Sequence, residues 1–332
     1  MSSTATTMEQ AVPPKAGPRA FVKRLRNGDE IAHLVTLVFA ASILLITSAL
    51  VYELWVNSRL ARVQFGFGFF AKTIWDPISG DFGAAPFIYG TLVTAIVSLA
   101  IALPLGLAAA IFLAELAPRK LSDSIAFLID LLAAVPSVIY GLLGIFIVVP
   151  LMRTTVGPAL IHTVGNVPLI GKFFKGPNYG VGFLTAGVVL AIMIVPFIIS
   201  VSREVLLTVP REQREAALGL GSTRWEATWK VVVPWARTGI MGSVFLALAR
   251  ALGETMAVTM VIGNDPKIAA SLFAPGYTIA AVIANEFSEA TGNLYLAALI
   301  ELGLVLFLMT FILNGLARIL IVATERGGGH PA

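Results

Sequence analysis

The sequence predicts an all-α membrane protein that crosses the bilayer about six times, with both termini on the cytoplasmic side. Of its 332 residues, 57% are hydrophobic and only 13% are charged, whereas a soluble domain is about half apolar and about a quarter charged. Apolar runs of about 20 residues recur along the chain, and a helix of that length crosses about 30 Å of hydrocarbon. Composition and run length therefore agree on the class.

The apolar runs give the order of the predicted elements. Residues 1 to about 30 are polar and basic, which is typical of a disordered cytoplasmic tail. The first apolar run is too long for a cleaved signal peptide, so we interpret it as a retained helix. The six predicted spans cover residues 31–54, 87–115, 121–151, 182–208, 238–262 and 293–322, and a short cytoplasmic tail, 323–332, follows them.

The basic residues predict the orientation, because Lys and Arg are enriched on the cytoplasmic side of membrane proteins. With the N-terminus inside, 15 of the 23 Lys and Arg residues fall in cytoplasmic segments and seven on the opposite side, while Arg250 lies within a span. The outer connections, near 56–86, 152–181 and 263–292, are rich in Gly, Pro and aromatic residues. The inner connection over 209–237 is long and charged.

Several function classes are excluded by what the sequence lacks. The net charge is +4, but the basic residues form no patch with interleaved aromatics, so no nucleic-acid partner is expected. The chain has no cysteine, and His33, His162 and His330 show no ligand spacing, so we expect neither a metal site nor a cofactor. It contains no G-x-x-x-x-G-K-[ST] loop and no Ser/His/Asp set, so we expect no catalysis.

The charged inner connection predicts two short helices joined by a glycine turn. Pro210 suits the first turn of a helix over 211–218, and Gly219 and Gly221 then supply the turn. An amphipathic helix pair of this kind can be a mere connector at the membrane surface.

The second of these helices is predicted to begin at Thr223. Thr223 and Glu226 have the spacing of a capping box, Trp225 and Trp229 fall on one face, and Pro234 is expected to end the helix.

Glu215-Ala216-Ala217, followed by Gly221 and Pro234, resembles the EAA motif of ABC-importer permeases. The resemblance implies a type I permease fold over residues 31–322, in which the loop 209–237 docks into a separate ATPase. It also implies that Glu215, Ala216, Ala217 and Gly221 couple the permease to that ATPase.

Four ionisable residues, Asp130, Arg250, Glu254 and Glu301, lie within predicted spans. Such groups cost about 2.5–3.5 kcal/mol each and usually face the bundle interior or a water-filled path. Arg250 and Glu254 are four residues apart, hence on one helical face. They predict either a structural ion pair or a guanidinium on the substrate path, held by Glu254, that attracts an anion. Asp130 and Glu301 are expected to be interhelical hydrogen-bond partners, with gating roles as the alternative.

Small residues and prolines inside the spans predict local helix geometry. Gly106, Gly141 and Gly144 are expected to allow close helix approach. Prolines are expected to kink their helices at 104, 136 and 196.

Further stretches, 75–91, 114–118, 131–141 and 250–264, resemble the PstC family of phosphate-importer permeases. The resemblance covers about residues 30–322. It implies a multi-pass permease subunit of an ATP-driven phosphate importer, embedded in the lipid of the inner membrane. The implied partners are a PstA-like second permease, two copies of a PstB-like ATP-binding subunit and a PstS-like periplasmic phosphate-binding protein.

Two alternatives stay open. An ABC permease for another oxyanion, such as sulfate or molybdate, would keep the Glu-Ala-Ala loop but would not need Arg250 or the 75–91 segment. An ion-coupled secondary transporter would not need the loop at all, and usually shows inverted repeats or broken helices.

Overall fold

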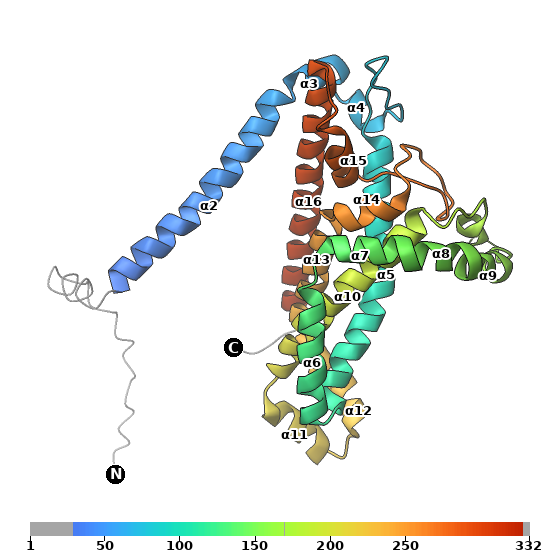
Figure 1. The fold of residues 1–332 in the computed structure, drawn as a ribbon. Coiled ribbons are helices and arrows are strands. Elements are labelled where there is room, and N and C mark those ends of the chain that lie inside the picture. The colour runs from blue at the N-terminus through green and yellow to red at the C-terminus, as the bar shows by residue number, and fades with distance from the viewer. Residues whose placement is uncertain (1–28, 169, 328–332) are drawn as a thin grey trace, which may run out of the picture. The chain divides into compact units, whose positions relative to one another are not determined.

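The structure of the chain is a computed structural model that describes residues 29–168 and 170–327 (Figure 1). Six of its helical segments are long and apolar enough to cross a membrane, which confirms the predicted number of spans. They cover Ala32–Asn57, Ala85–Leu116, Ser137–Thr163, Phe183–Leu207, Arg224–Leu252 and Asn293–Val322. Of the two predicted tails, residues 1–28 and 328–332 lie outside the described residues.

Helix α2 (Asp29–Asn57) is a single uninterrupted apolar helix. Thr36 and Thr47 each donate a side-chain hydrogen bond to the carbonyl four residues earlier, at 2.8 and 2.9 Å. Their hydroxyls are therefore satisfied within the helix, as an apolar environment requires. Residues up to Glu53, which include most of α2, form a compact unit separate from the rest of the chain.

The remaining helices form the second unit. Its shorter elements are α3 (Arg59–Phe65), α4 (Gly68–Ala71), α6 (Arg119–Ala133), a 3-10 turn (Ile170–Phe174), α11 (Arg211–Gly219), α12 (Arg224–Ala227), α14 (Met256–Ile262) and α15 (Ile279–Glu286). Its long elements are α5 (Ala85–Ile111), which ends in a π-helical turn (Phe112–Leu116), α10 (Phe183–Leu207), α13 (Val233–Leu252) and α16 (Asn293–Gly327).

Helices α5 and α10 pack against each other at the centre of this unit, and α10 is its most buried span. The two backbones approach closely because glycines face branched side chains. A Cβ on Gly106 would lie 2.8 Å from Ile198, and one on Gly187 would lie 2.4 Å from Val97. The prediction that Gly106 allows close approach is thus confirmed, and small residues serve here as they do at other membrane helix contacts.

The third span is not where the sequence predicted it. Helix α6 ends at Ala133 and a new helical segment begins at Ser137, so the span is 137–163 rather than 121–151. Pro136 is the reason, since it has an extended ψ of 140° and lacks the N–H that would continue α6. It therefore separates two helices instead of kinking one.

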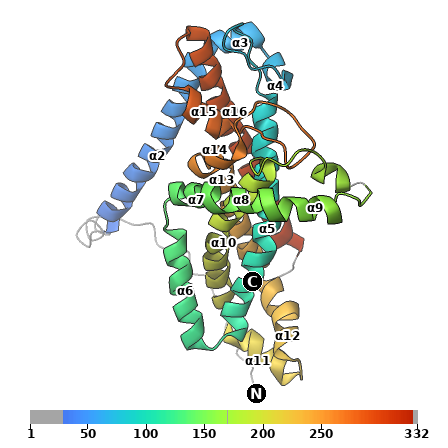
Figure 2. The same ribbon diagram turned by 45° about the vertical axis from the view of Figure 1, so that its right-hand side comes forward.

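The new segment contains α7 (Ser137–Leu143), α8 (Val149–Leu151) and α9 (Gly157–Thr163), joined by π-helical turns over Gly144–Val148 and Met152–Val156. In both ribbon views it runs across α5 rather than beside it (Figures 1 and 2).

The fifth span is also displaced, to 224–252 from the predicted 238–262. Pro234 does not end the helix that begins after Thr223. A π-helical turn (Thr228–Val232) precedes it, and the proline occupies the first turn of α13, where its missing N–H is tolerated. The helix ends instead at Leu252.

Helices α3, α4 and α15 and the start of α16 make up one end of this unit (Figure 2). A cluster of aromatic side chains packs at this end. Trp75 packs edge-on against Phe82 and Phe87, with ring centroids 4.8 Å apart in both pairs. Its indole Nε1 donates to Glu286 at 2.8 Å. Burial raises the pKa of Tyr277 to about 12. The opposite end carries α11 and α12.

Candidate functional site

The charged connection over 209–237 folds as the two predicted helices, α11 and the one that starts with α12. Gly221, at the turn between them, has a left-handed φ of +85°. The predicted capping box is present, because Glu226 N donates to Thr223 Oγ1 at 3.2 Å and Thr223 N donates to Glu226 Oε2 at 3.0 Å. These local signals confirm the helix–turn–helix, which we call the coupling hairpin (residues 209–237).

A cluster around Arg214 holds the hairpin to the transmembrane helices. Its Nε lies 3.1 and 3.2 Å from the two Glu115 oxygens, and its Nη2 lies 2.7 Å from Oε1. The same guanidinium donates to the carbonyls of Leu206, at 2.8 Å, and Val209, which belong to the last turn of α10 and the residues after it. Both charges are largely buried, since 21% of Arg214 and 10% of Glu115 side chains are exposed.

A second arginine, Arg203, joins two helices near the Arg214 cluster. Arg203 donates to Ser122 Oγ at 3.1 Å and to Asp123 Oδ1 at 2.9 Å, which joins α10 to the first turn of α6. Sequence reasoning assigned no role to these pairs. A signal did exist for Glu115, a carboxylate at the end of an apolar run, just before Pro118.

The four motif residues take different positions on the hairpin. Ala217 is buried at 7% exposure, whereas Glu215, Ala216 and Gly221 are exposed. Glu215 has no hydrogen-bond or ion-pair partner within the described part of the chain. Its carboxylate is therefore free to meet another molecule.

Apolar side chains stand out from the tip of the hairpin. Leu220 is 89% exposed, and Trp225 and Trp229 are 56% and 45% exposed with ring centroids 5.6 Å apart. Exposed apolar groups that gather in one place mark an interaction surface.

The predicted Arg250–Glu254 pair on one helical face does not form. Helix α13 ends at Leu252, and α14 begins at Met256, so Glu254 lies in the break between them. Its Oε1 accepts a hydrogen bond from Ala257 N at 3.1 Å, which caps α14. Gly253 after Leu252 still has a right-handed backbone, with φ −91° and ψ 0°, so the chain leaves the helix only beyond it.

Arg250 remains exposed in the last turn of α13. A cation is favoured there by the helix dipole. Its charge acts on Tyr140 of α7, whose hydroxyl donates to the Leu132 carbonyl at 2.7 Å across the Pro136 break. Two helix interruptions, at 134–136 and 253–255, thus come together near Arg250.

Helices α7 and α14 meet through the glycines that the sequence singled out. A Cβ on Gly141 would lie 2.4 Å from Met260 Sδ, and one on Gly144 would lie 2.7 Å from Val261. Their predicted role in close helix approach is confirmed.

The other two charged residues within predicted spans behave differently from each other. Asp130 Oδ1 accepts a hydrogen bond from Ser200 Oγ at 2.8 Å, so the predicted interhelical bond between α6 and α10 is confirmed. For Glu301 the same prediction is wrong, because one of its oxygens is buried with no partner among the residues that the structure describes.

A family model for the binding-protein-dependent transport system inner membrane component matches residues 102–325. The chain belongs to this family. The match covers the coupling hairpin, both helix interruptions and the last four spans.

Curated relatives of this family member align over almost its whole length. It is 45% identical over 325 residues to the phosphate transport system permease protein PstC of Mesorhizobium japonicum, covering 98% of this chain and 99% of that one. It is 47% identical over 297 residues to PstC of Xylella fastidiosa, covering 90% and 91%.

Solved structures support the fold of this inner-membrane component. A bacterial alginate ABC transporter aligns with a TM-score of 0.56 at 16% identity, over 90% of this chain and 96% of that one. The MetNI methionine ABC transporter in an inward-facing conformation aligns with a TM-score of 0.52 at 16% identity, over 76% and 99%. The chain therefore has the fold of ABC-importer permeases and is a multi-pass membrane component of a transport complex.

Proposed function

We propose that this chain is a permease subunit of an ATP-driven phosphate importer. The observation that carries the proposal is the 45–47% identity, nearly end to end, to proteins named as phosphate transport system permeases. With a PstA-like second permease it forms the phosphate path across the inner membrane. A PstS-like protein delivers phosphate from the periplasm, and two PstB-like subunits hydrolyse ATP.

The coupling hairpin docks into the ATP-binding subunit on the cytoplasmic side, where both termini also lie. Glu215 and Ala216 are exposed there, and the apolar tip at Leu220 and Trp225 supplies surface to bury. The Arg214–Glu115 pair supports this role, because it joins the hairpin to α5 and α10 and so carries a motion of the ATPase to the spans.

Phosphate passes close to Arg250. Its guanidinium is exposed at the end of α13 and has no ion-pair partner in the described part of the chain, so its donors are free for an oxyanion. Glu254 serves the path by holding the start of α14, rather than by holding Arg250 as the sequence suggested.

The alternatives make different demands on the same residues. A permease for sulfate or molybdate needs the exposed hairpin but does not need Arg250, so substrate competition and the Arg250 variant together separate it from a phosphate permease. An ion-coupled secondary transporter has no use for an exposed hairpin that carries Glu215.

Uptake into vesicles tests the proposal. The chain and its three partner proteins are reconstituted with ATP enclosed, and radiolabelled phosphate is added with the binding protein outside. We expect vanadate-sensitive uptake that sulfate and molybdate do not compete away. Arg250→Gln is expected to lower uptake at least about tenfold, as loss of one charge-assisted contact of about 1.5–3 kcal/mol implies.

Arg153→Gln is the matched control, because Arg153 is an exposed arginine in the π-helical turn before α9 and is not assigned to the path. Uptake without ATP, or uptake that sulfate saturates equally well, contradicts the proposal.

A further inference from the structure

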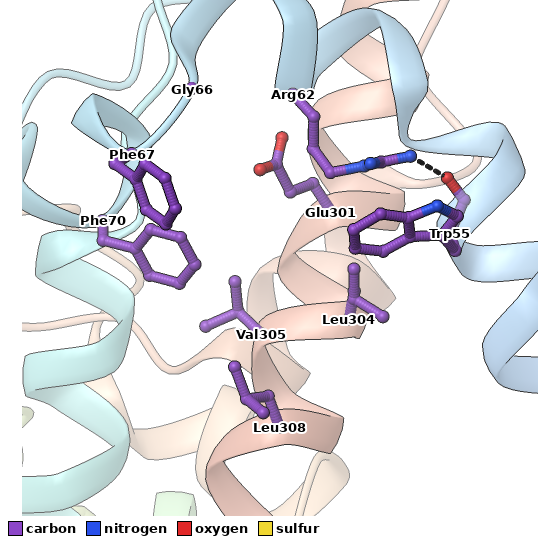
Figure 3. Close-up of a pocket in the computed structure, with 9 residues that line it drawn as sticks. All are labelled: Trp55, Arg62, Gly66, Phe67, Phe70, Glu301, Leu304, Val305 and Leu308. Carbon is purple, nitrogen blue, oxygen red and sulfur yellow. Dashed lines mark hydrogen bonds between the residues drawn. The ribbon is translucent and has the colours of Figure 1, made fainter.

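A pocket of about 380 Å³ lies between α3, α4 and α16, away from the hairpin and from Arg250. Figure 3 shows its two chemically distinct parts. Arg62 and Glu301 stand at one end, and Val305 and Leu308 continue along α16 at the other. Phe67 and Phe70 form the facing wall.

Glu301 is the unusual group in this pocket. Its residue is 3% exposed, and its Oε2 is buried without a hydrogen-bond partner within the described residues. The carboxyl points into the pocket, between Arg62 and the two phenylalanines (Figure 3). A buried carboxylate without a partner is strongly unfavourable in an apolar setting, so the site favours a ligand that brings a donor to it.

Arg62 supplies the complementary charge. Its Nε donates to Ser58 Oγ at 3.1 Å, its Nη2 donates to the Trp55 carbonyl, and its guanidinium lies 3.6 Å from the centre of the Trp55 ring. These contacts fix the group but use only part of its five N–H donors. No ion-pair contact joins Arg62 and Glu301 among the described residues, so a gap separates the two charges (Figure 3).

The position of Trp55 fits the boundary between headgroups and hydrocarbon. Trp55, whose ring lies against the Arg62 guanidinium, is close to the end of the first candidate span at Asn57. Tryptophan is enriched at the headgroup level of membranes. At about 1.5 Å per residue, Leu308 lies ~10 Å further along α16 than Glu301. The charged end of the pocket is thus near the headgroups, and its apolar end extends into the acyl chains.

We propose that this pocket binds one phospholipid with a primary-amine headgroup, of the phosphatidylethanolamine type. The ammonium donates to Glu301, the phosphate accepts from Arg62, and an acyl chain lies against Val305 and Leu308. The zwitterion matches both charges at once, whereas phosphatidylglycerol offers Glu301 only neutral hydroxyl donors and phosphatidylcholine has no N–H to donate. The site is independent of the transported substrate.

Photo-crosslinking on the assembled transporter tests the site. The probe is a phosphatidylethanolamine that carries a photoreactive group in its acyl chain, in nanodiscs of either phosphatidylethanolamine or phosphatidylglycerol background. We expect labelled peptides from α3–α4 and from 301–308 of α16. Excess unlabelled phosphatidylethanolamine should suppress labelling about tenfold more effectively than phosphatidylglycerol, which is the factor expected for one charge-assisted hydrogen bond.

Variants test the headgroup contact and the apolar end of the pocket separately. Glu301→Gln is expected to abolish the preference for phosphatidylethanolamine over phosphatidylglycerol while labelling persists. Leu308→Trp fills the apolar end and should lower labelling at least about fivefold. Leu316→Trp is its control, since Leu316 is a similarly exposed leucine on the same helix (52% against 46%) that does not line the pocket.

Three results overturn the proposal. They are an unchanged lipid preference in Glu301→Gln, equal labelling in the two tryptophan variants, and crosslinks to a protein partner in place of lipid. Because thermal unfolding of each variant is measured alongside, a loss of labelling counts only for variants that remain folded.

Discussion

Arg214 and Glu115 form a two-pronged ion pair although 99 residues separate them in the chain. Glu115 lies in the π-helical turn that ends α5, and Arg214 lies in α11 of the coupling hairpin. The same guanidinium also binds the Leu206 carbonyl at the end of α10. One side chain therefore joins the hairpin to the two most central spans, which makes the hairpin a rigid extension of the core.

Removing this pair should loosen the hairpin before it affects the spans. Arg214→Gln is expected to lower the free energy of unfolding by about 2 kcal/mol, because a largely buried carboxylate loses its charged donors. Hydrogen exchange over 211–219 should quicken, while exchange in α10 stays slow. In a double-mutant cycle with Glu115→Gln, the coupling energy is expected to be about 1–3 kcal/mol.

The exposed pair Lys230–Glu226, at 3.5 Å, provides a comparison on the same hairpin. Lys230→Gln should change stability by no more than about 0.5 kcal/mol, as for other i,i+4 pairs. If Arg214→Gln and Lys230→Gln lowered the free energy of unfolding equally, the burial and bidentate geometry of the Arg214 pair would add no stability over an exposed pair.

Gly221 and Gly219 differ only in backbone conformation. Nothing lies within 4 Å of a Cβ placed on either residue, but Gly221 has a φ of +85°. Gly221→Ala should cost about 1–2 kcal/mol through left-handed backbone strain, and should lower ATP-dependent uptake because the turn shifts. Gly219→Ala lies in α11 and should be neutral or slightly stabilising. Thermal unfolding and uptake assays report both, and an inactive Gly219→Ala with an active Gly221→Ala would reverse the expected order.

Gly90 tests the packing of α5 against the loop before α15. A Cβ there would lie 2.1 Å from the Tyr277 carbonyl oxygen, which is backbone and cannot swing aside. Gly90→Ala is therefore expected to destabilise the protein by about 1–3 kcal/mol, as over-packing does elsewhere. Gly242→Ala is the control, since nothing lies within 4 Å of its Cβ. Detergent-solubilised protein should melt earlier only for the first variant.

Features that depend on neighbouring residues could be predicted from the sequence. Run length gave the number of spans, and the Thr223–Glu226 spacing gave the start of α12, because each depends on a few adjacent residues. The hairpin turn at Gly221 followed from the same kind of local signal.

Span boundaries failed where a helix break lies inside an apolar run. The residues around Pro136 are apolar on both sides, and around Gly253 only Arg250 and Glu254 interrupt the apolar run, so hydropathy alone continued the span through each break. The Arg250–Glu254 pair was wrong for this reason, since its geometry assumed an unbroken helix.

Contacts between distant segments could not be predicted either. Nothing near Arg214 in the sequence indicates Glu115 as its partner, and nothing near Glu301 indicates that Arg62 shares its pocket. Such pairs depend on how whole helices pack, which periodicity does not determine.

Labelling from outside the cell tests whether the coupling hairpin lies in the cytoplasm and contacts a separate ATPase. The chain has no cysteine, so single substitutions give unambiguous labels. Ala216→Cys marks the hairpin, and Ser79→Cys marks an exposed loop residue at the opposite end of the same unit. In intact cells, a membrane-impermeant maleimide should label Ser79→Cys alone, and Ala216→Cys should crosslink to the ATP-binding subunit. Labelling of Ala216→Cys from outside, or crosslinking of Ser79→Cys to the ATPase instead, would contradict the account.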